Sequence, residues 1–472
     1  MGTTSSALLM LFAFLFMEGI EFCCSSTNPN VSCIASEREA LIEFKGKLKD
    51  DANRLSTWVG KDCCLWKGVS CSRKTGHVMK LDLRNPIPFD SYKGDFIQHS
   101  ANFDKNRLSG EISPSLLVLN HLSYIDLSMN NFSDMQFPEF FGSMKSLRYL
   151  DLSWSQFFSG MIPHHLGNLS RLQYLNLSNN ALVGPIPDTL GRLISLTVLD
   201  LSFNDFDNSM LHCLSNLSSL VHMDIGSNYF NSLIPDALGR STALTFLDLS
   251  DNNLDNSLLC SLCNLTGLVH LDLGFNYLHG SIPYCFGKLP SISVLKLDYN
   301  SFQDPIPSEI GNMTQLTELH FTRNKFKGEI PNSMWRNLCN LRVLDLSNNK
   351  FKGEIPTPCK TSVACAYLIY PITSSVGTFL LCCVDDKSSF GNQKHADESN
   401  VADETDFLWF YTGIGPGFLV RFLGVCGTLN FKKSWRYAYF QFIENNYNWI
   451  SINIAIKFAQ LRRKFNKGKF GG

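Results

Sequence analysis

Hydrophobic positions recur with a nearly fixed period along most of the chain. The string LxxLxLxxNxL repeats at intervals of 24 or 25 residues, after a stretched first copy that begins near Val78. Its first apolar position falls at Leu122, Leu147, Leu172, Leu196, Leu220, Leu244, Leu268, Ile292, Leu316 and Leu341. Such a period predicts a solenoid in which each repeat buries its apolar face only against its neighbours. We therefore expect about 11 repeats over residues 78–356.

Within each repeat, the LxL segment predicts a short strand whose two leucines point inward, as for Leu150 and Leu152. An asparagine follows the strand at Asn130, Asn180, Asn204, Asn228, Asn252, Asn276, Asn300, Asn324 and Asn349. Its amide can both donate to and accept from the backbone of the turn that leaves the strand. Ser155 takes this place in one repeat, where a shorter hydroxyl cannot make the same pair of bonds.

Two apolar runs outside the repeats predict targeting and membrane insertion. Residues 7–17 have the length of a signal-peptide core, so we expect a signal peptide over residues 1–25. Residues 407–430 carry the single charge Arg421 and are long enough to cross a bilayer. Acidic residues precede this run, in a segment spanning 357–406, and a basic tail follows at 431–472, which places the repeats outside the cell. A second uncharged run, 361–384, is a weaker alternative span because it would put the basic tail outside.

Composition and motif searches exclude several functional classes. The 472-residue chain has a formal net charge of −1, which argues against a strongly basic nucleic-acid-binding protein. It contains no G-x-S-x-G, H-E-x-x-H or P-loop string, and the predicted tail is too short for a kinase. We therefore expect no enzyme, no metal and no cofactor. Cys260 and Cys263 form a lone CxxC, which we interpret as small apolar residues on the convex side instead of a redox or zinc site.

The second halves of the repeats carry a further motif. They read LVGPIP at 182–187, LHGSIP at 278–283 and FKGEIP at 326–331 and 351–356, and resemble plant-specific leucine-rich repeats. Residues 33–72 match the N-terminal cap of plant extracellular repeat proteins through Cys33, Leu55, Trp58, Cys63, Cys64, Trp66 and Cys71. Residues 424–442 look like the membrane exit of plant receptor-like proteins, which are cell-surface receptors without a kinase domain.

This resemblance implies a curved α/β-type repeat solenoid with an N-terminal disulfide cap and one transmembrane helix. In the cap, Cys33 would pair with Cys63, and Cys64 with Cys71. The array is short for the family, whose members usually have twenty or more repeats, and residues 357–396 fit neither a repeat nor a C-terminal cap.

Stacked strands align equivalent residues into columns across the concave face. Because aromatic and arginine side chains are the usual anchors of protein interfaces, two columns are predicted to bind ligand. The first contains Trp154, Phe203, Phe275, Tyr299 and Arg323, and the second contains Tyr149, Tyr174, His222, Phe246 and His270. A central column of mostly aspartates, from Asp126 to Asp345, is interpreted as solvated and bonded to serine hydroxyls. A cation-binding or pH-sensitive edge near His320 is the alternative.

Two sets of residues predict modification and helix contacts. Glycosylation sequons occur at Asn30, Asn131, Asn168, Asn176, Asn216, Asn264 and Asn312. Four of these recur every 48 residues after the strand and would stack on one side of the array, whereas Asn176 lies on the strand face. In the predicted span, Gly413 and Gly417 allow close approach of a partner helix. The charge of Arg421 there predicts either an acidic partner or impaired delivery to the cell surface.

Together these features predict a single-pass type I protein of the plasma membrane. By resemblance it binds an extracellular peptide, protein or glycan and signals through a receptor-like kinase adaptor or co-receptor, in defence or in development. One alternative is a membrane-tethered inhibitor of a secreted wall-degrading enzyme, because short plant arrays resemble polygalacturonase inhibitors. The other is a truncated decoy that binds ligand without signalling.

Overall fold

The computed structural model describes residues 32–87, 96–133, 135–156, 160–207, 214, 216–231 and 243–352, together with two strands at Ala366–Ile372 and Ser375–Leu381. These residues belong to one compact unit, Met1–Val384. No helix among them is long and apolar enough to span a bilayer. The predicted signal peptide, the predicted span with Gly413, Gly417 and Arg421, the basic tail and Asn30 lie outside the described residues.

One sheet of fourteen strands runs through this unit in the order β2-β3-β5-β6-β7-β9-β11-β12-β13-β15-β17-β19-β21-β22. The strands are β2 Val69–Cys71, β3 Val78–Asp82, β5 Tyr124–Asp126, β6 Tyr149–Asp151, β7 Tyr174–Asn176, β9 Val198–Asp200, β11 His222–Asp224, β12 Phe246–Asp248, β13 His270–Asp272, β15 Val294–Lys296, β17 Glu318–His320, β19 Val343–Asp345, β21 Ala366–Ile372 and β22 Ser375–Leu381. From β3 to β21 neighbouring strands are parallel and in register. Each strand from β5 to β19 begins two residues after a predicted first apolar position, so the period of the sequence sets the strand positions.

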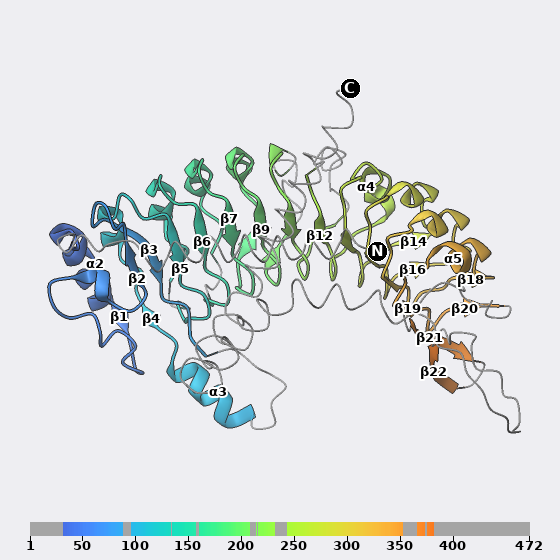
Figure 1. The fold of residues 1–472 in the computed structure, drawn as a ribbon, viewed down its shortest axis with the longest axis horizontal. Helices are drawn as coiled ribbons and strands as arrows, with labels where there is room; N and C mark the ends of the chain where they lie inside the picture. Colours follow the sequence, from blue (N-terminus) through green and yellow to red (C-terminus); the bar gives the residue numbers. More distant parts are fainter. Residues whose placement is uncertain are drawn as a thin grey trace, which may run out of the picture. The chain divides into compact units, whose positions relative to one another are not determined.

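Short helices occupy the opposite side of the array from the strands (Figure 1). They are η2 Pro114–Val118, η3 Glu139–Ser143, η4 His164–Asn168, η5 Asp188–Arg192, η8 Asn256–Leu258, α4 Leu259–Leu262, η9 Tyr284–Lys288, η10 Ser308–Asn312 and α5 Asn332–Asn337. Most are five-residue 3-10 helices, because a repeat of 24 residues leaves room for only one or two helical turns. The proline of the IP motif precedes several of them, as Pro187 does for η5, and its fixed φ prepares the first turn.

Smaller strand pairs flank the main sheet. The pairs are β8 Val183–Gly184 with β10 Asp205–Phe206, β14 His279–Gly280 with β16 Ser301–Phe302, and β18 Lys327–Gly328 with β20 Lys350–Phe351. The glycine of the LxGxIP motif lies in each first strand, and Gly184 has a φ of 78°, which favours glycine. β1 Leu48–Lys49, which directly follows α2 Ala35–Lys47 in the chain, pairs with β4 Ser109–Gly110, which comes after α3 Phe96–Lys105.

The predicted asparagine ladder is confirmed by the hydrogen bonds. In one repeat, Asn204 Nδ2 donates to the carbonyls of Leu201 and Ser202 and also to that of Leu177 in the preceding repeat, at 3.0–3.1 Å. Asn204 Oδ1 accepts from the amide of Leu182, again in the preceding repeat, at 3.1 Å. The side chain is buried, so each bond satisfies a backbone group that is shielded from water.

In the repeat where Ser155 replaces the ladder asparagine, a backbone carbonyl makes one of the missing hydrogen bonds. Ser155 Oγ donates to the carbonyl of Leu127 at 3.2 Å, which reproduces one of the asparagine bonds. In most of the other repeats the equivalent amide donates to an asparagine Oδ1. Here the amide of Phe132 donates to the backbone carbonyl of Ser155 at 2.8 Å. The hydroxyl is too short for both bonds, as predicted, and a local change of backbone direction, with Gln156 at a φ of 57°, supplies the second.

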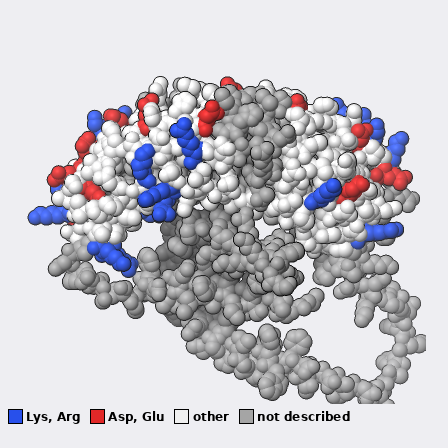
Figure 2. All heavy atoms as spheres, turned by 90° about the horizontal axis from the view of Figure 1, so that it is seen from above, with Lys and Arg blue, Asp and Glu red and all other residues white. Residues whose placement is uncertain are grey.

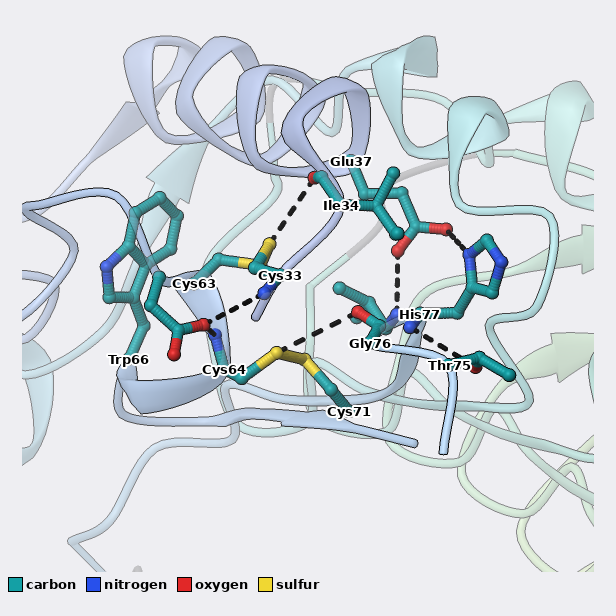
Figure 3. The surroundings of a disulfide bond; sticks show 12 residues. Cys33, Ile34, Glu37, Cys63, Cys64, Trp66, Cys71, Thr75, Gly76 and His77 are labelled. Atoms are coloured by element: carbon teal, nitrogen blue, oxygen red, sulfur yellow. Dashed lines mark hydrogen bonds and ion pairs between the residues drawn. A yellow bond between two sulfur atoms is a disulfide. The ribbon is translucent and has the colours of Figure 1, made fainter. Parts of the chain in front are cut away.

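The N-terminal cap contains the two disulfides that the resemblance implied. Cys33 is bonded to Cys63, and Cys64 to Cys71, beside η1 Cys63–Leu65 (Figure 3). The stacked rings of Trp58 and Trp66 are buried next to them, so the cap closes the apolar end of the repeat core.

A third disulfide joins Cys263 to Cys285 and corrects the interpretation of Cys263 as a small apolar residue. The two cysteines belong to successive repeats, and their Cα atoms are 5.7 Å apart. Their separation of 22 residues differs from the repeat period, which is why a comparison of equivalent positions did not pair them. Cys260 is exposed and is the one free cysteine among the described residues.

The sheet continues past residue 356. β21 pairs in parallel with β19, placing Tyr367 opposite Val343, and β22 then returns antiparallel to β21. Two paired strands therefore lie within the segment, residues 357–396, that fits neither a repeat nor a cap in sequence.

Candidate ligand-binding face

From β5 to β19, the central residue of each strand is buried. In β6 the central Leu150 is fully buried, whereas Tyr149 before it is half-buried on the strand face. The register sets Tyr149 opposite Tyr174, and His222 opposite Phe246, which is itself opposite His270. The second predicted column therefore exists as a row of neighbouring side chains.

This row consists of two separate stacks of rings. Tyr149 lies between Tyr124 and Tyr174, with centroids 4.1 and 4.2 Å apart. Phe246 lies between His222 and His270, with centroids 4.1 and 4.4 Å apart. Val198, which is smaller and buried, separates the two stacks. Inside each stack the ring faces are covered by neighbours, so mainly the ring edges remain for a ligand.

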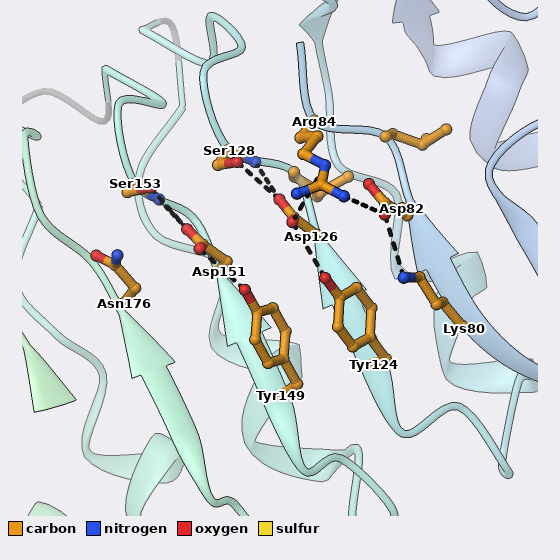
Figure 4. Close-up of polar contacts among 12 residues, drawn as sticks. Lys80, Asp82, Arg84, Tyr124, Asp126, Ser128, Tyr149, Asp151, Ser153 and Asn176 are labelled. Atoms are coloured by element: carbon orange, nitrogen blue, oxygen red, sulfur yellow. Dashed lines mark hydrogen bonds and ion pairs between the residues drawn. The ribbon is translucent and has the colours of Figure 1, made fainter. Parts of the chain in front are cut away.

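The tyrosine hydroxyls are also engaged within the protein (Figure 4). Tyr124 Oη donates to Asp126 Oδ2, and Tyr149 Oη donates to Asp151 Oδ2, both at 3.3 Å. At the end of the stack, Lys80 Nζ lies 4.0 Å from the centroid of Tyr124. Tyr149 and Tyr174, which the sequence predicted to bind ligand, thus belong to an internally bonded network.

Three of the central aspartates, Asp126, Asp151 and Asp272, are buried, contrary to the sequence interpretation, whereas Asp200, Asp224, Asp248 and Asp345 are half-buried and still reach solvent. Asp126 is only 1% exposed, and Asp151 is also buried, because the flanking rings cover them. The predicted bonds to serine are present: Ser128 Oγ donates to Asp126, and Ser153 Oγ to Asp151, both at 2.7 Å. Burial, followed by repulsion from neighbouring aspartates, raises the pKa of Asp126 to about 7.

Burial also shifts the pKa values of titratable residues further along the strand face, from β11 onward. Burial raises the pKa of Asp224 to about 8, with repulsion from Asp200 and Asp248 adding to the effect. Burial also lowers the pKa of His222 and of His270 to about 4, which keeps both imidazoles neutral. Further along, Lys296 Nζ lies 2.9 Å from Asp272. His320 Nε2 lies 3.5 Å from Glu318 Oε2.

The other predicted column lies in the turn that follows each strand, immediately before the ladder asparagine. All its described members have a left-handed backbone, with φ between 51° and 54° from Trp154 to Asn348. Phe203 is 57% exposed, and Trp154, Phe275, Tyr299 and Arg323 are exposed as well. The Phe275 ring stacks on Tyr299 at 3.9 Å, and the Arg323 guanidinium lies 4.9 Å from the Tyr299 centroid, so three successive repeats form one stack.

Two further aromatic residues were missed by the sequence analysis. Tyr229 is 58% exposed and Tyr277 is 66% exposed, and each directly follows a ladder asparagine. A scan of the positions on both sides of that asparagine would have found them. We call Phe203, Tyr229, Phe275, Tyr277, Tyr299 and Arg323 the aromatic rim.

The predicted glycosylation sites fall into two groups. Asn168, Asn216, Asn264 and Asn312 are exposed, close to the outer helices and away from the strand face. Asn176 is half-buried in β7, where its Oδ1 accepts from Ser178 and its Nδ2 donates to Tyr174 Oη at 3.4 Å. Asn131 is also half-buried.

The charged side chains on the described part of the face shown in Figure 2 are of both signs and interspersed, and most of that surface is uncharged. A polyanion such as nucleic acid would require a field of one sign. The described residues on the side shown in Figure 2 present no such field.

Comparison with known families gives the class of the protein. A model described as "leucine-rich repeat region" matches residues 106–273 and 195–354, and one described as "leucine rich repeat N-terminal domain" matches residues 34–72. The chain therefore belongs to the leucine-rich repeat family.

Its similarity to individual proteins is narrower. Receptor-like protein EIX2 of Solanum lycopersicum is 40% identical over 140 residues, which are 29% of this chain and 13% of that protein. Receptor-like protein EIX1 of the same organism is 44% identical over 119 residues, 24% of this chain and 11% of that protein. The matches confirm the resemblance to plant receptor-like proteins, although they span only about an eighth of those relatives.

A solved structure shares the fold. The Arabidopsis receptor kinase HAESA, in complex with the peptide hormone IDA and the co-receptor SERK1, has a TM-score of 0.60 and 30% identity. The match covers 71% of this chain and 53% of that chain.

Proposed function

We propose that this protein is a cell-surface receptor-like protein without enzymatic activity. It binds an extracellular peptide, protein or glycan on its strand side, with the aromatic rim as the anchor, and signals through a partner receptor kinase in plant defence. The observation that carries the proposal is that large aromatic side chains occupy exposed positions with a left-handed backbone.

Burial in the core does not explain that observation, because these side chains remain exposed. Asn and Asp adopt the left-handed conformation most readily, and they take this position at Asn179, Asp251 and Asn348. A bulky residue there costs about 1 kcal/mol or more. Phe203 and Phe275 accept this cost while most of the Phe203 ring stays in water and Phe275 is exposed. Aromatic side chains that remain this exposed in the free protein are available to anchor a partner.

The relatives support the receptor class and suggest the kind of partner. The structurally similar HAESA ectodomain binds a peptide hormone together with a co-receptor. For this chain we propose a peptide as the first ligand class to test. The predicted span, with Gly413 and Gly417 on one helix face, is the proposed contact with the kinase partner at the plasma membrane.

Immunoprecipitation of the tagged full-length chain from leaf membranes, followed by mass spectrometry, tests the proposal. We expect a receptor kinase with the wild-type chain and its loss on replacing Gly413 and Gly417 by Leu. A Phe275→Ser, Tyr299→Ser chain should lose extracellular ligands, whereas Tyr284→Ser, at an exposed tyrosine on η9, should retain them. Equal recovery by all variants would contradict the proposal. Recovery of wall-degrading enzymes without a kinase would favour the inhibitor, and recovery of ligand alone would favour the decoy.

A further inference from the structure

Two histidines from neighbouring rungs meet at the N-terminal cap, far from the aromatic rim. Lys80 of β3 pairs with Tyr124 of β5, and the same register extended three residues toward the strand starts sets His77 opposite His121. The two imidazole rings stack with centroids 3.9 Å apart and planes inclined by 22°. His121 is exposed and His77 is half-buried, so the pair is accessible from solvent.

A buried carboxylate fixes the orientation of one of these rings. Glu37 of α2 is 3% exposed, and its Oε2 accepts from the amide of Val78 at 2.7 Å. Its Oε1 lies 2.8 Å from His77 Nδ1. Figure 3 marks this contact with a dashed line. A carboxylate can only accept, so Nδ1 carries the proton and Nε2, on the far side of the ring, presents its lone pair.

The bond between His77 and Glu37 is of the kind that proteins use to orient metal-binding histidines. A ligating histidine commonly donates its other ring N–H to a carboxylate, which sets the tautomer and strengthens the ligand. One ligand atom from each of Glu37, His77 and His121 lies within 4.8 Å of the others. Among the described residues, the His121 imidazole makes a stacking contact but no hydrogen bond or ion pair, so its nitrogens are free to bind.

We propose that His77 and His121 form a binding site for a divalent transition metal, with Glu37 as the orienting carboxylate. Two imidazoles and a nearby carboxylate suit Zn²⁺, Cu²⁺ or Ni²⁺, whereas Ca²⁺ and Mg²⁺ require a shell of oxygen ligands. Water fills the remaining positions. The three residues lie 40 and 44 positions apart in the chain, which is why a search for local ligand spacings predicted no metal. The site does not depend on the proposed receptor function.

Calorimetric titration of the untagged full-length chain with ZnCl₂, CuCl₂ and CaCl₂ tests the site. We expect one tightest site per chain for Zn²⁺ and Cu²⁺ and none of similar affinity for Ca²⁺. His121→Ala should weaken that site at least about tenfold, and Glu37→Gln about tenfold through the loss of orientation. His164→Ala, at an exposed histidine on η4, is the matched control and should bind as the wild type does.

Two further readouts separate ligation from packing. Because His121 is exposed, His121→Ala should keep the circular dichroism and melting temperature of the metal-free chain. With Cu²⁺, electron paramagnetic resonance should show coupling to two imidazole nitrogens in the wild type and to one in His121→Ala. A His121→Ala chain that binds Zn²⁺ as tightly as the wild type would overturn the proposal, as would equal binding of Ca²⁺.

Discussion

The ring of Phe275 stacks on the ring of Tyr299 across two neighbouring repeats, with centroids 3.9 Å apart, and both side chains remain exposed. Each ring is attached to a left-handed residue, with φ of 52° and 51°. The turn thus presents aromatic surface at positions where the backbone favours Asn or Asp. The left-handed backbone disfavours an aromatic residue at these positions, and the exposed ring gains little burial in return. Substitution at an equivalent position can measure the resulting cost in stability.

We expect Phe203→Asn to raise the free energy of unfolding by about 1 kcal/mol, because Asn tolerates the left-handed backbone better and the lost ring is 57% exposed. Chemical denaturation would report the change. The reverse substitution, Asn179→Phe, should destabilise the chain by a similar amount. A large loss of stability in Phe203→Asn would mean that the ring packs within the protein and is not kept for a partner.

The ladder asparagines should be among the most sensitive polar positions. Asn228→Ala removes donors to Leu201, Ile225 and Gly226 and leaves the amide of Phe206 without its acceptor. We expect a loss of about 3 kcal/mol, since each buried unpaired group costs about 1–3 kcal/mol. Ser155→Ala is the control and should lose about 1 kcal/mol, because there the backbone of residue 155 already accepts from Phe132. Equal losses in the two variants would argue against the role of the amide.

The third disulfide should contribute measurably to stability. Cys285→Ser opens the loop between Cys263 and Cys285, and the chain-entropy model gives a loss of about 3 kcal/mol for a loop of this length. Thermal unfolding without reductant would measure it, and peptide mapping would verify the pairing. Cys260→Ser, at the exposed free thiol nearby, should leave the melting temperature unchanged.

Stability should depend on pH through the aspartates of the strands, such as Asp224, which is half-buried. The pKa of Asp224 in the folded protein, about 8, lies above its ordinary 3.8, so the protonated carboxyl stabilises the fold. That contribution is complete below pH 3.8 and is lost as the pH rises through about 8. We expect the melting temperature to fall from pH 5 to pH 8, and to fall less in Asp224→Asn. Asp251→Asn, at an exposed aspartate of the turn, should retain the full dependence.

The half-buried histidines should lower the stability of the fold as the pH falls, whereas the aspartates lower it as the pH rises. The pKa of His222 is about 4 in the folded protein against an ordinary value of 6.5, so the fold excludes the proton. Stability is therefore lost as the pH falls from 6.5 through about 4. A His222→Phe chain should lose less stability over this interval. Identical profiles for the wild type and this variant would contradict the assignment.

Much of this architecture follows from the sequence because a repeat multiplies a weak local signal. The spacing of Leu147, Leu172 and Leu196 fixes three strand positions, and the cap resemblance yields both disulfides of Cys33 and Cys64. What escaped prediction depends on contacts between repeats. Alternation assigns Asp151 to the solvent face, but the stacked tyrosines cover it, and no periodic comparison reveals that cover.

At the candidate site, too, the sequence predicted the positions of residues but not the contacts that they make between repeats. The sequence located both columns, yet it could not tell that the hydroxyl of Tyr149 is bonded internally while Phe203 projects into solvent. It also passed over Tyr277, because the column was defined on one side of the ladder asparagine only. Pairs brought together by helix geometry, such as Cys263 with Cys285, have no periodic signature.

The ladder has a direction. Asn204 completes the backbone of the repeat before it, at Leu177 and Leu182, and its own repeat is completed in turn by Asn228. On the ribosome, each coil would therefore remain unfinished until the next one has emerged. Folding would then proceed one repeat behind synthesis. If translation paused before Asn204 emerged, the carbonyl of Leu177 and the amide of Leu182 would remain hydrogen-bonded to water.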